Sequence, residues 1–208
     1  MIKNLIFDFD GTISDSYPIF VRIVREVAAE FDVAVTMSDG ELLDKLMISA
    51  RDCLNAMNFP GEPIDRANCF WKHQRLHRYE FQAFPEIEPI LKKSLSLGKK
   101  NYIYTHSGDV VHEMLENMGL HRYFSGIVTA DHGFANKPAP DALFYLCETY
   151  GVDPAESMMI GDRDIDTMSG NNAGMSGCLW DPCDRYVNYQ TEYKIKTLNE
   201  LYDLLDNI

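Results

Sequence analysis

The 208-residue chain lacks several features that would assign it to particular classes of protein. Positive charge is scarce, because 19 lysines and arginines face 32 acidic residues and the net charge is −13. Double-stranded nucleic acid and anionic membranes are therefore poor partners, although a local cation can still bind an anionic substrate. No apolar run approaches the roughly 20 residues that a membrane-spanning helix needs. The sequence also has no internal repeat and no low-complexity segment.

Cysteines are few, and no CxxC motif pairs them. Their number is odd, five in all: Cys53, Cys69, Cys147, Cys178 and Cys183. No secretory signal precedes the first motif, before which only four residues stand. Reduced thiols and a cytoplasmic location are the simplest interpretation of this pattern.

The chain has enough apolar residues to form a core, since 46% of it is hydrophobic and 12% is aromatic. A short buried strand is expected at 4–10. After residue 84, apolar runs alternate with helical patterns, which predicts an α/β fold built on a doubly wound parallel sheet. The expected strands there are 101–105, 126–130, 157–162 and 176–180, and the expected helices are 86–97, 109–118, 140–150, 164–172 and 197–206.

A different pattern fills the segment between the first strand and residue 83. Apolar residues recur there at helical spacing, as at Phe20, Ile23, Val24, Val27, Ala28 and Phe31. Further helices are expected at 38–48, 50–58 and 63–80, and no convincing strand occurs. We therefore expect a core domain made of residues 1–14 and 83–208, with a helical domain of residues 15–82 inserted after the first strand.

Polar residues follow four of the apolar runs. The segments are Asp8-Phe9-Asp10-Gly11-Thr12, Thr105-His106-Ser107-Gly108, Asn136-Lys137-Pro138 and Gly161-Asp162-Arg163-Asp164-Ile165-Asp166. Parallel strands bring their carboxyl ends to one edge of the sheet, where ligands bind in folds of this type. The edge would then gather several carboxylates, one hydroxyl and one lysine.

Such a set is suited to phosphoryl transfer. Clustered carboxylates need a hard cation, and oxygen ligands suit Mg²⁺. Thr105 can donate to a phosphate oxygen, and Lys137 can neutralise another. Asp8 and Asp10 lie two residues apart, so they share one face of a strand. One carboxylate can attack phosphorus while the other protonates the leaving oxygen and then activates water.

These four segments resemble the four motifs of the haloacid dehalogenase-like superfamily, in their order and approximate spacing. Residues 170–175, of sequence GNNAGM, and the helical insertion further resemble the phosphoglycolate phosphatase and β-phosphoglucomutase branch. The resemblance implies a Rossmann-like core with a helical cap. An acid at position 10 also argues against dehalogenation, because the dehalogenases of the superfamily lack it.

The resemblance implies a role for each motif residue. Asp8 would be the nucleophile and a metal ligand, and Asp10 the general acid and base, with its backbone carbonyl on the metal. Asp162 would complete the protein ligands to Mg²⁺. Thr105 and Lys137 would hold the transferring phosphate.

Three further residues receive supporting roles. Asp166 would orient Lys137 or a metal-bound water from the second coordination shell, where Thr12 would lie as well. His106 either contacts substrate or fills its loop, and the sequence leaves both open.

The sequence leaves three functions open. The first is a Mg²⁺-dependent phosphatase that hydrolyses a small phosphorylated metabolite. The second is a phosphosugar mutase, and the third is a regulatory module that accepts phosphate without turnover. The large helical insertion and the carboxylate-rich fourth motif argue against the third. The particular substrate stays open, and a monomer is the default oligomeric state.

Two apparent metal motifs are set aside. Asp162, Asp164 and Asp166 begin like an EF-hand loop, but its glycine and closing glutamate are missing. His73 and His77 have the spacing of zinc-binding helices, but Gln74 replaces the glutamate of the metalloprotease motif. We therefore expect these two histidines to lie on a solvated face.

Overall fold

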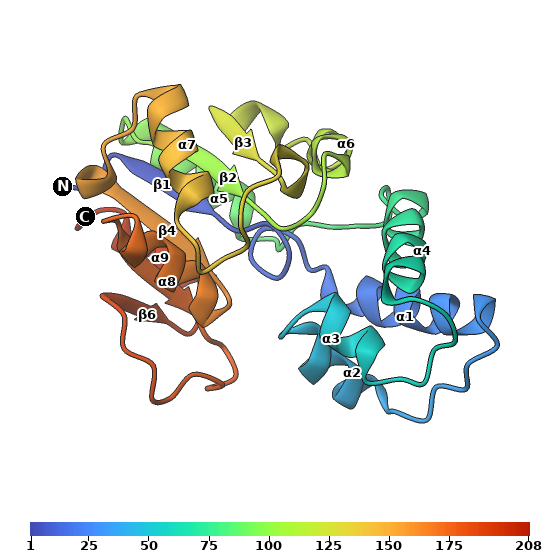
Figure 1. The fold of residues 1–208 in the computed structure, drawn as a ribbon. Helices are drawn as coiled ribbons and strands as arrows, with labels where there is room; N and C mark the ends of the chain where they lie inside the picture. The colour runs from blue at the N-terminus through green and yellow to red at the C-terminus, as the bar shows by residue number, and fades with distance from the viewer. The chain divides into compact units, whose positions relative to one another are not determined.

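The computed structural model describes all residues from 1 to 208 and divides them into two compact units (Figure 1). The first unit, the core, comprises Met1–Ser14 and Ala83–Ile208, and the second, the helical unit, comprises Asp15–Gln82. None of the helices combines the length and the apolar character that crossing a membrane requires.

The core is built on one six-stranded sheet in which every pairing is parallel. Its spatial order is β3-β2-β1-β4-β5-β6, so the first strand lies in the middle. The strands are β1 (Asn4–Phe7), β2 (Lys100–Tyr104), β3 (Gly126–Val128), β4 (Ser157–Gly161), β5 (Ser176–Trp180) and β6 (Tyr193–Ile195). All four residues of β1 are buried, which means that both faces of the sheet are covered, as expected of a doubly wound fold.

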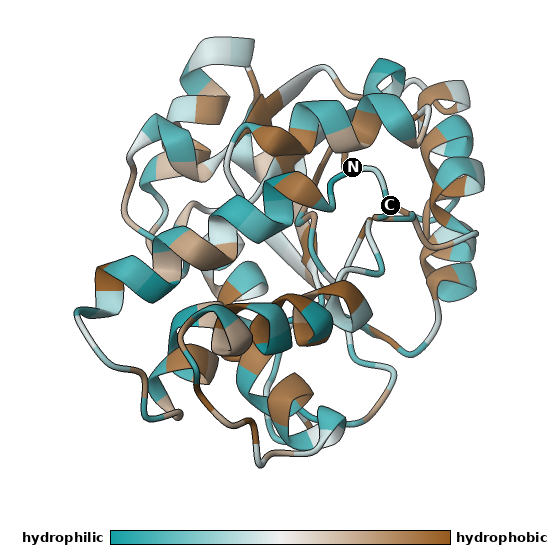
Figure 2. Ribbon diagram, turned by 90° about the vertical axis from the view of Figure 1, so that its right-hand side faces the viewer, coloured by the Kyte–Doolittle hydropathy of each residue, from teal (hydrophilic) through white to brown (hydrophobic).

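Helices and short 3-10 turns connect these strands. The helices of the core are α5 (Ile87–Ser96), α6 (Val110–Asn117), α7 (Asp141–Tyr150), α8 (Asp164–Asn172) and α9 (Leu198–Leu204), and the 3-10 turns are His121–Tyr123, Ala130–His132 and Pro154–Glu156. Hydrophobic and hydrophilic residues alternate along the helical ribbons, as expected of helices that bury one side (Figure 2).

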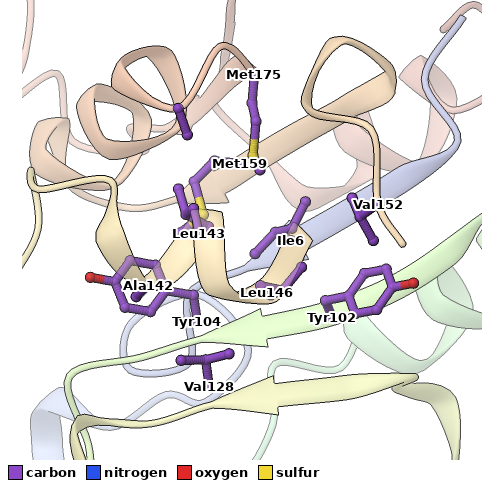
Figure 3. Close-up of a cluster of buried hydrophobic side chains, with 11 residues drawn as sticks. Ile6, Tyr102, Tyr104, Val128, Ala142, Leu143, Leu146, Val152, Met159 and Met175 are labelled. Carbon is purple, nitrogen blue, oxygen red and sulfur yellow. The ribbon is translucent and has the colours of Figure 1, made fainter. Parts of the chain in front are cut away.

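One face of the sheet packs against α7 (Figure 3). Leu143 and Leu146 of this helix are fully buried in one cluster with Ile6 of β1, Tyr102 of β2 and Met159 of β4. Helical spacing on α7 and alternate spacing on the strands together bring these residues to one interface. This packing keeps the middle strands in register and so holds the carboxyl ends of β1, β2 and β4 together.

The helical unit contains α1 (Tyr17–Glu30), α2 (Asp39–Leu46), α3 (Ala50–Asn55) and α4 (Pro63–Leu76). The first residues of α2 and α4 follow known sequence preferences for the start of a helix. Ser38 caps α2 through a reciprocal pair of contacts with Glu41, and Pro63 opens α4, where its missing N–H costs nothing. Phe20 of α1 packs against Phe70 of α4, with ring centroids 5.5 Å apart.

The predicted parallel sheet with flanking helices is confirmed, and the errors are at the ends of elements and in one additional strand, β6. Strand β1 ends at Phe7 because the chain turns beyond it, and β3 ends at Val128 because a 3-10 turn follows. The third and fourth helices end at Asn55 and Leu76, earlier than expected. Strand β6 was not predicted, since a three-residue strand at the sheet edge carries no clear alternation.

Truncation of Leu146 to alanine should destabilise the core, because it opens a cavity in a fully buried cluster. We expect Leu146→Ala to lower the free energy of unfolding by about 2–5 kcal/mol. The matched control is Leu95→Ala in α5, a residue that is 41% exposed, which should change it by about 0.5 kcal/mol or less. Urea unfolding followed by circular dichroism measures both, and equal losses would contradict the packing described.

Candidate active site

The carboxyl ends of the three middle strands supply the polar residues of the candidate site. Phe7 of β1 pairs with Ile103 of β2 on one side and with Ile160 of β4 on the other. Asp8 follows β1 directly, and its N–H still donates to the carbonyl of Ile160, 2.8 Å away. Thr105 and Asp162 each stand two residues beyond the partner of Phe7. The register of the sheet therefore brings all three to one edge.

The Lys137 ammonium group lies between two buried carboxylates. Its Nζ is 2.6 Å from Asp8 Oδ1 and 2.8 Å from Asp166 Oδ1. It also donates to the main-chain carbonyl of Tyr104 at 2.9 Å. The side chains of Lys137, Asp8 and Asp166 are at most 2% exposed. A buried ion pair of this kind needs several partners to offset desolvation, and Lys137 has three.

Asp8 keeps one oxygen without a partner. Its Oδ2 is buried and accepts no hydrogen bond, whereas Oδ1 is bound to Lys137. Burial raises the pKa of Asp8 to about 7; Lys137 opposes this rise and Asp166 adds to it. A buried carboxylate oxygen with no partner is costly unless a cation or a reacting group takes it.

The carboxylates of Asp8, Asp162 and Asp166 form a cluster that is suited to a cation. One oxygen of each lies within 4.8 Å of the others, and all three residues are buried. Thr12 donates its hydroxyl hydrogen to Asp162 Oδ1 at 3.2 Å. Asp166 is already engaged, because it contacts Lys137 through Oδ1 and accepts from the Arg163 N–H through Oδ2 at 3.0 Å.

The backbone at two glycines allows this close arrangement. Gly11, with φ of +79°, makes the turn that follows Asp10, a conformation that other residues rarely adopt. At Gly161 a Cβ atom would fall 2.3 Å from the Cβ of Asp166, so only glycine lets β4 pass so close to that carboxylate.

Asp10 is held by a residue to which the sequence assigned no role. Ser107 donates its hydroxyl hydrogen to Asp10 Oδ2 at 2.5 Å, and its N–H donates to Thr105 Oγ1 at 3.0 Å. Ser107 thus joins the loops that follow β1 and β2. Its position two residues after Thr105 is the one feature of the sequence that could have indicated this role. A serine in a glycine-containing loop is, however, too common to be informative.

His106 supports the loop that carries Lys137. Its Nε2 accepts from the Lys137 N–H at 2.9 Å, which requires the neutral ring. Burial and the nearby Lys137 ammonium lower the pKa of His106 to about 3, in agreement with that requirement. This contact gives His106 a structural part, and its contact with substrate stays a prediction.

The prediction of a solvated face for the two histidines of α4 is wrong for His73. Its side chain is only 11% exposed and lies between Glu26 and Glu30 of α1, 2.8 Å from each. The side chain of His77 is 20% exposed and also lies between two carboxylates, those of Glu26 and Glu80. The sequence missed this because Glu26 and Glu30 come from a helix more than 40 residues away from His73.

Comparison with known families identifies the class of protein. The family model of haloacid dehalogenase-like hydrolases matches residues 5–179. The chain therefore belongs to this family, and it is a hydrolase of the branch that includes phosphoglycolate phosphatases. The predicted family resemblance is confirmed.

Individual relatives support this assignment. A phosphoglycolate phosphatase from Psychrobacter arcticus is 28% identical over 184 residues, covering 82% of this chain and 80% of the relative. A fructose-1-phosphate phosphatase from Escherichia coli is 26% identical and covers 83% of this chain and 93% of its own length.

Solved structures with lower identity share the fold. A haloacid dehalogenase-like family hydrolase from Streptococcus pneumoniae superposes with a TM-score of 0.80 at 20% identity, over 97% of both chains. The CbbY protein from Rhodobacter sphaeroides, solved in complex with phosphate, has a TM-score of 0.80 at 16% identity, over 97% of this chain and 96% of its own.

Replacement of Lys137 by methionine should leave two buried carboxylates without their cation. We expect Lys137→Met to lower the free energy of unfolding near neutral pH by about 3–5 kcal/mol. The loss should shrink as the pH falls, because Asp8 and Asp166 then become neutral by protonation.

The matched control for this prediction is Lys92→Met. Lys92 pairs with Glu88 at 3.0 Å but is 58% exposed, so its loss should cost about 0.5 kcal/mol or less. Chemical unfolding of both variants at two pH values measures the effect, and an equally small change for Lys137→Met would contradict the charge balance described.

Proposed function

We propose that this protein is a Mg²⁺-dependent phosphatase that hydrolyses a small phosphomonoester through a phosphorylated Asp8. The observation that supports this proposal most directly concerns the Asp8 carboxylate. One of its oxygens accepts from Lys137, and the other is buried without a partner. Relatives named as phosphatases of phosphoglycolate and fructose 1-phosphate support the substrate class. Their different substrates leave the particular metabolite open.

The donor set fits a magnesium ion. Three buried carboxylates stand against two basic side chains, Lys137 and Arg163, so the cluster carries more negative than positive charge, and all its donors are oxygens. Asp8, Asp162 and the backbone carbonyl of Asp10 would hold the ion. Asp166 already contacts Lys137 through Oδ1 and the Arg163 N–H through Oδ2, which supports a place for it in the second shell. When bound, Mg²⁺ supplies positive charge against the phosphate oxygens.

The first chemical step belongs to Asp8 and Asp10. The unpartnered Asp8 Oδ2 attacks phosphorus while the bond from phosphorus to the leaving oxygen breaks. Asp10, held in place by Ser107, gives its proton to that oxygen, which leaves as an alcohol. Thr105 donates to a phosphate oxygen during the transfer, and the ammonium charge of Lys137 beside Asp8 offsets the charge of the phosphate.

The second step returns the enzyme to its starting state. Asp10, now a carboxylate, takes a proton from water as the water oxygen attacks phosphorus. The bond between phosphorus and Asp8 breaks, and inorganic phosphate is released. Lys137 stabilises the Asp8 carboxylate that forms again, because it stays within 2.6 Å of Oδ1.

The helical unit, residues 15–82, would serve as the cap of this enzyme. Its two connections to the core are at Ser14 and Ala83, which form a bridge with each other, and Ser14 lies only four residues after Asp10. A unit attached there can cover a bound substrate and exclude bulk water.

Replacement of Asp8 by asparagine should abolish turnover, because the amide is a poor nucleophile and Lys137 loses one of its two counter-charges. We expect Asp8→Asn to reduce kcat for p-nitrophenyl phosphate at least about 10³-fold. The matched control is Asp153→Asn, an exposed aspartate of the core whose capping of Ala155 an asparagine can keep, and it should retain full activity.

The assay should follow inorganic phosphate. Stoichiometric release of phosphate supports hydrolysis, whereas an isomerised sugar phosphate would indicate a mutase and a single retained phosphate would indicate a regulatory module. Turnover of Asp8→Asn at the wild-type rate would overturn the assignment of the nucleophile.

Magnesium binding should strengthen as the pH rises toward 7. Burial raises the pKa of Asp8 to about 7, so below that pH a proton competes with the cation for its carboxylate. We expect the Kd for Mg²⁺ to fall by up to about tenfold per pH unit below 7 and to level off above it. Calorimetric titration at several pH values measures this, and a Kd that does not depend on pH would contradict it.

A further inference from the structure

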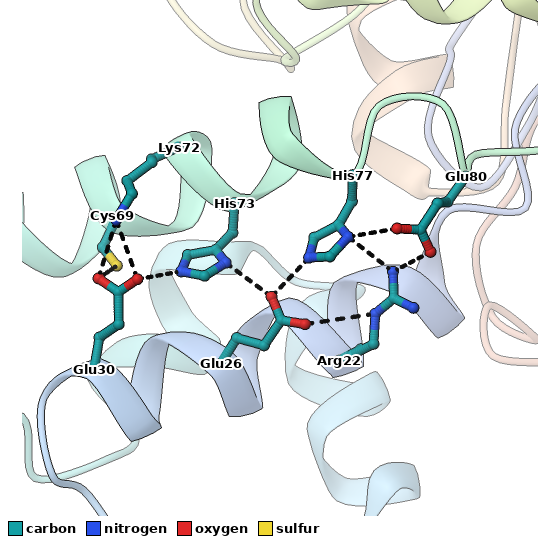
Figure 4. Close-up of polar contacts among 8 residues, drawn as sticks. All are labelled: Arg22, Glu26, Glu30, Cys69, Lys72, His73, His77 and Glu80. Atoms are coloured by element: carbon teal, nitrogen blue, oxygen red, sulfur yellow. Dashed lines mark hydrogen bonds and ion pairs between the residues drawn. The ribbon is translucent and has the colours of Figure 1, made fainter.

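A second cluster of metal-binding side chains lies in the helical unit, between α1 and α4 (Figure 4). Each helix contributes residues one turn apart: Glu26 and Glu30 from α1, and His73 and His77 from α4. Residues four apart lie on the same side of a helix, so two pairs of side chains face each other here. All of these residues belong to the helical unit, and the proposed phosphatase mechanism uses none of them.

Glu26 occupies the centre of the cluster. Its Oε2 lies 2.8 Å from His73 Nδ1 and 2.7 Å from His77 Nε2. The two imidazole rings are nearly parallel, with an interplanar angle of 20° and centroids 6.3 Å apart. The carboxylate oxygen and the two ring nitrogens all lie within 4.8 Å of one another.

The outer nitrogen of each ring also faces a carboxylate. His73 Nε2 lies 2.8 Å from Glu30 Oε1, and His77 Nδ1 lies 2.6 Å from Glu80 Oε1. Histidines that bind metals are oriented in this way, with the second nitrogen donating to a carboxylate that fixes the ring. The arrangement thus contains both an inner ligand set and the groups that orient it.

Neutral histidines leave the cluster short of hydrogens, and either added protons or a cation at its centre can make up the shortage. A carboxylate oxygen only accepts, and a neutral imidazole carries a single N–H hydrogen. Four ring nitrogens facing carboxylates would therefore need four hydrogens, two more than neutral rings carry. A cation on the Glu26 side would leave each ring with one hydrogen, directed at Glu30 or Glu80.

The charges around the cluster agree with this interpretation. Three carboxylates, those of Glu26, Glu30 and Glu80, are offset by only two basic side chains. Arg22 lies 2.6 Å from Glu80 Oε2, 3.1 Å from His77 Nδ1 and 3.7 Å from Glu26 Oε1, and Lys72 lies 3.1 Å from Glu30. If both histidines are neutral, the three carboxylates and two basic side chains therefore give the cluster a net charge of −1.

We propose that Glu26, His73 and His77 form a zinc site that joins α1 to α4. Nitrogen donors select Zn²⁺ over Mg²⁺, and two histidines with one glutamate are a known set of zinc ligands. Tetrahedral bonds of about 2.0–2.1 Å place ligand atoms roughly 3.3 Å apart. Small rotations of the side chains reach that spacing from the present one. The partial exposure of Glu26 and His77, 31% and 20%, leaves access for a water as the fourth ligand.

The site would stabilise the helical unit, because it connects segments 47 residues apart in the chain. A metal that binds only the folded form stabilises it by mass action. Amide hydrogen exchange in α1 and α4 should therefore slow when zinc is added, while exchange in the core sheet stays unchanged.

The principal test measures zinc stoichiometry in the full-length protein. Protein stripped by a chelator is saturated with Mg²⁺, so that the carboxylates of the core are occupied, and is then titrated with Zn²⁺. We expect one tightly bound zinc per chain in the wild type and none in the double variant His73→Gln/His77→Gln.

The matched control removes two other histidines. His112 and His121 of the core face each other at 3.1 Å between ring nitrogens, and His112→Gln/His121→Gln should retain the bound zinc. Failure of the wild type to bind zinc at micromolar concentration overturns the proposal, as does equal binding by the His73→Gln/His77→Gln variant.

Two exposed or conservative variants keep the test independent of folding. Glu80→Gln should weaken zinc binding about 10–100-fold, because it replaces the charged carboxylate that orients His77 by a neutral amide, a weaker acceptor. Cys69, whose Sγ lies 3.2 Å from Glu30 Oε2, is outside the proposed ligand set. Cys69→Ser should therefore leave zinc affinity unchanged.

Cobalt substitution identifies the ligands directly. Co²⁺ in the wild type should show the visible bands of a tetrahedral site without a thiolate-to-cobalt charge-transfer band. A charge-transfer band that disappears in Cys69→Ser would overturn the assignment, because it would place the metal on Glu30, Cys69 and His73 instead.

Discussion

The charge balance around Lys137 is the constraint on which the rest of the core depends. One buried ammonium group partly neutralises two buried carboxylates, Asp8 and Asp166, and it also contacts the backbone carbonyl of Tyr104, the last residue of β2. Asp8 follows β1, and Asp166 lies in α8 after β4. The contacts of Lys137 therefore require the end of β1 and the first turn of α8 to lie side by side. A shift in the register of the strands would leave a buried charge without a partner.

The sheet makes this arrangement possible by burying β1 on both faces. Because β1 lies in the middle, the loops after β2 and β4 flank the segment that carries Asp8 and Asp10. Ser107 and Thr12 then hold the acids of neighbouring loops, Asp10 and Asp162. The cost of gathering acids at one edge is offset by these contacts and, in the proposed function, by a divalent cation.

The helical unit also gathers several carboxylates at one interface, and there they contact histidines. Its glutamates and histidines alternate across the interface of α1 and α4, where each ring meets two carboxylates (Figure 4). The core cluster contains only oxygen donors and suits magnesium, whereas the cluster of the helical unit contains nitrogen donors and suits zinc. One chain would thus carry two cation sites of distinct chemistry, one for the reaction and one for the stability of the unit attached to it.

The amino-acid sequence alone determined the parallel α/β sheet, the family and the residues that come together at its edge, because these depend on local patterns. Apolar runs of four or five residues predict strands, and Asp8, Thr105 and Asp162 follow such runs directly. Only the tertiary structure decided which partner each polar group has. The pairing of Lys137 with Asp8 spans 129 positions, that of Ser107 with Asp10 spans 97, and the contacts of His73 come from a helix more than 40 positions away. Such contacts follow from packing between distant segments, and no local pattern in the sequence records them.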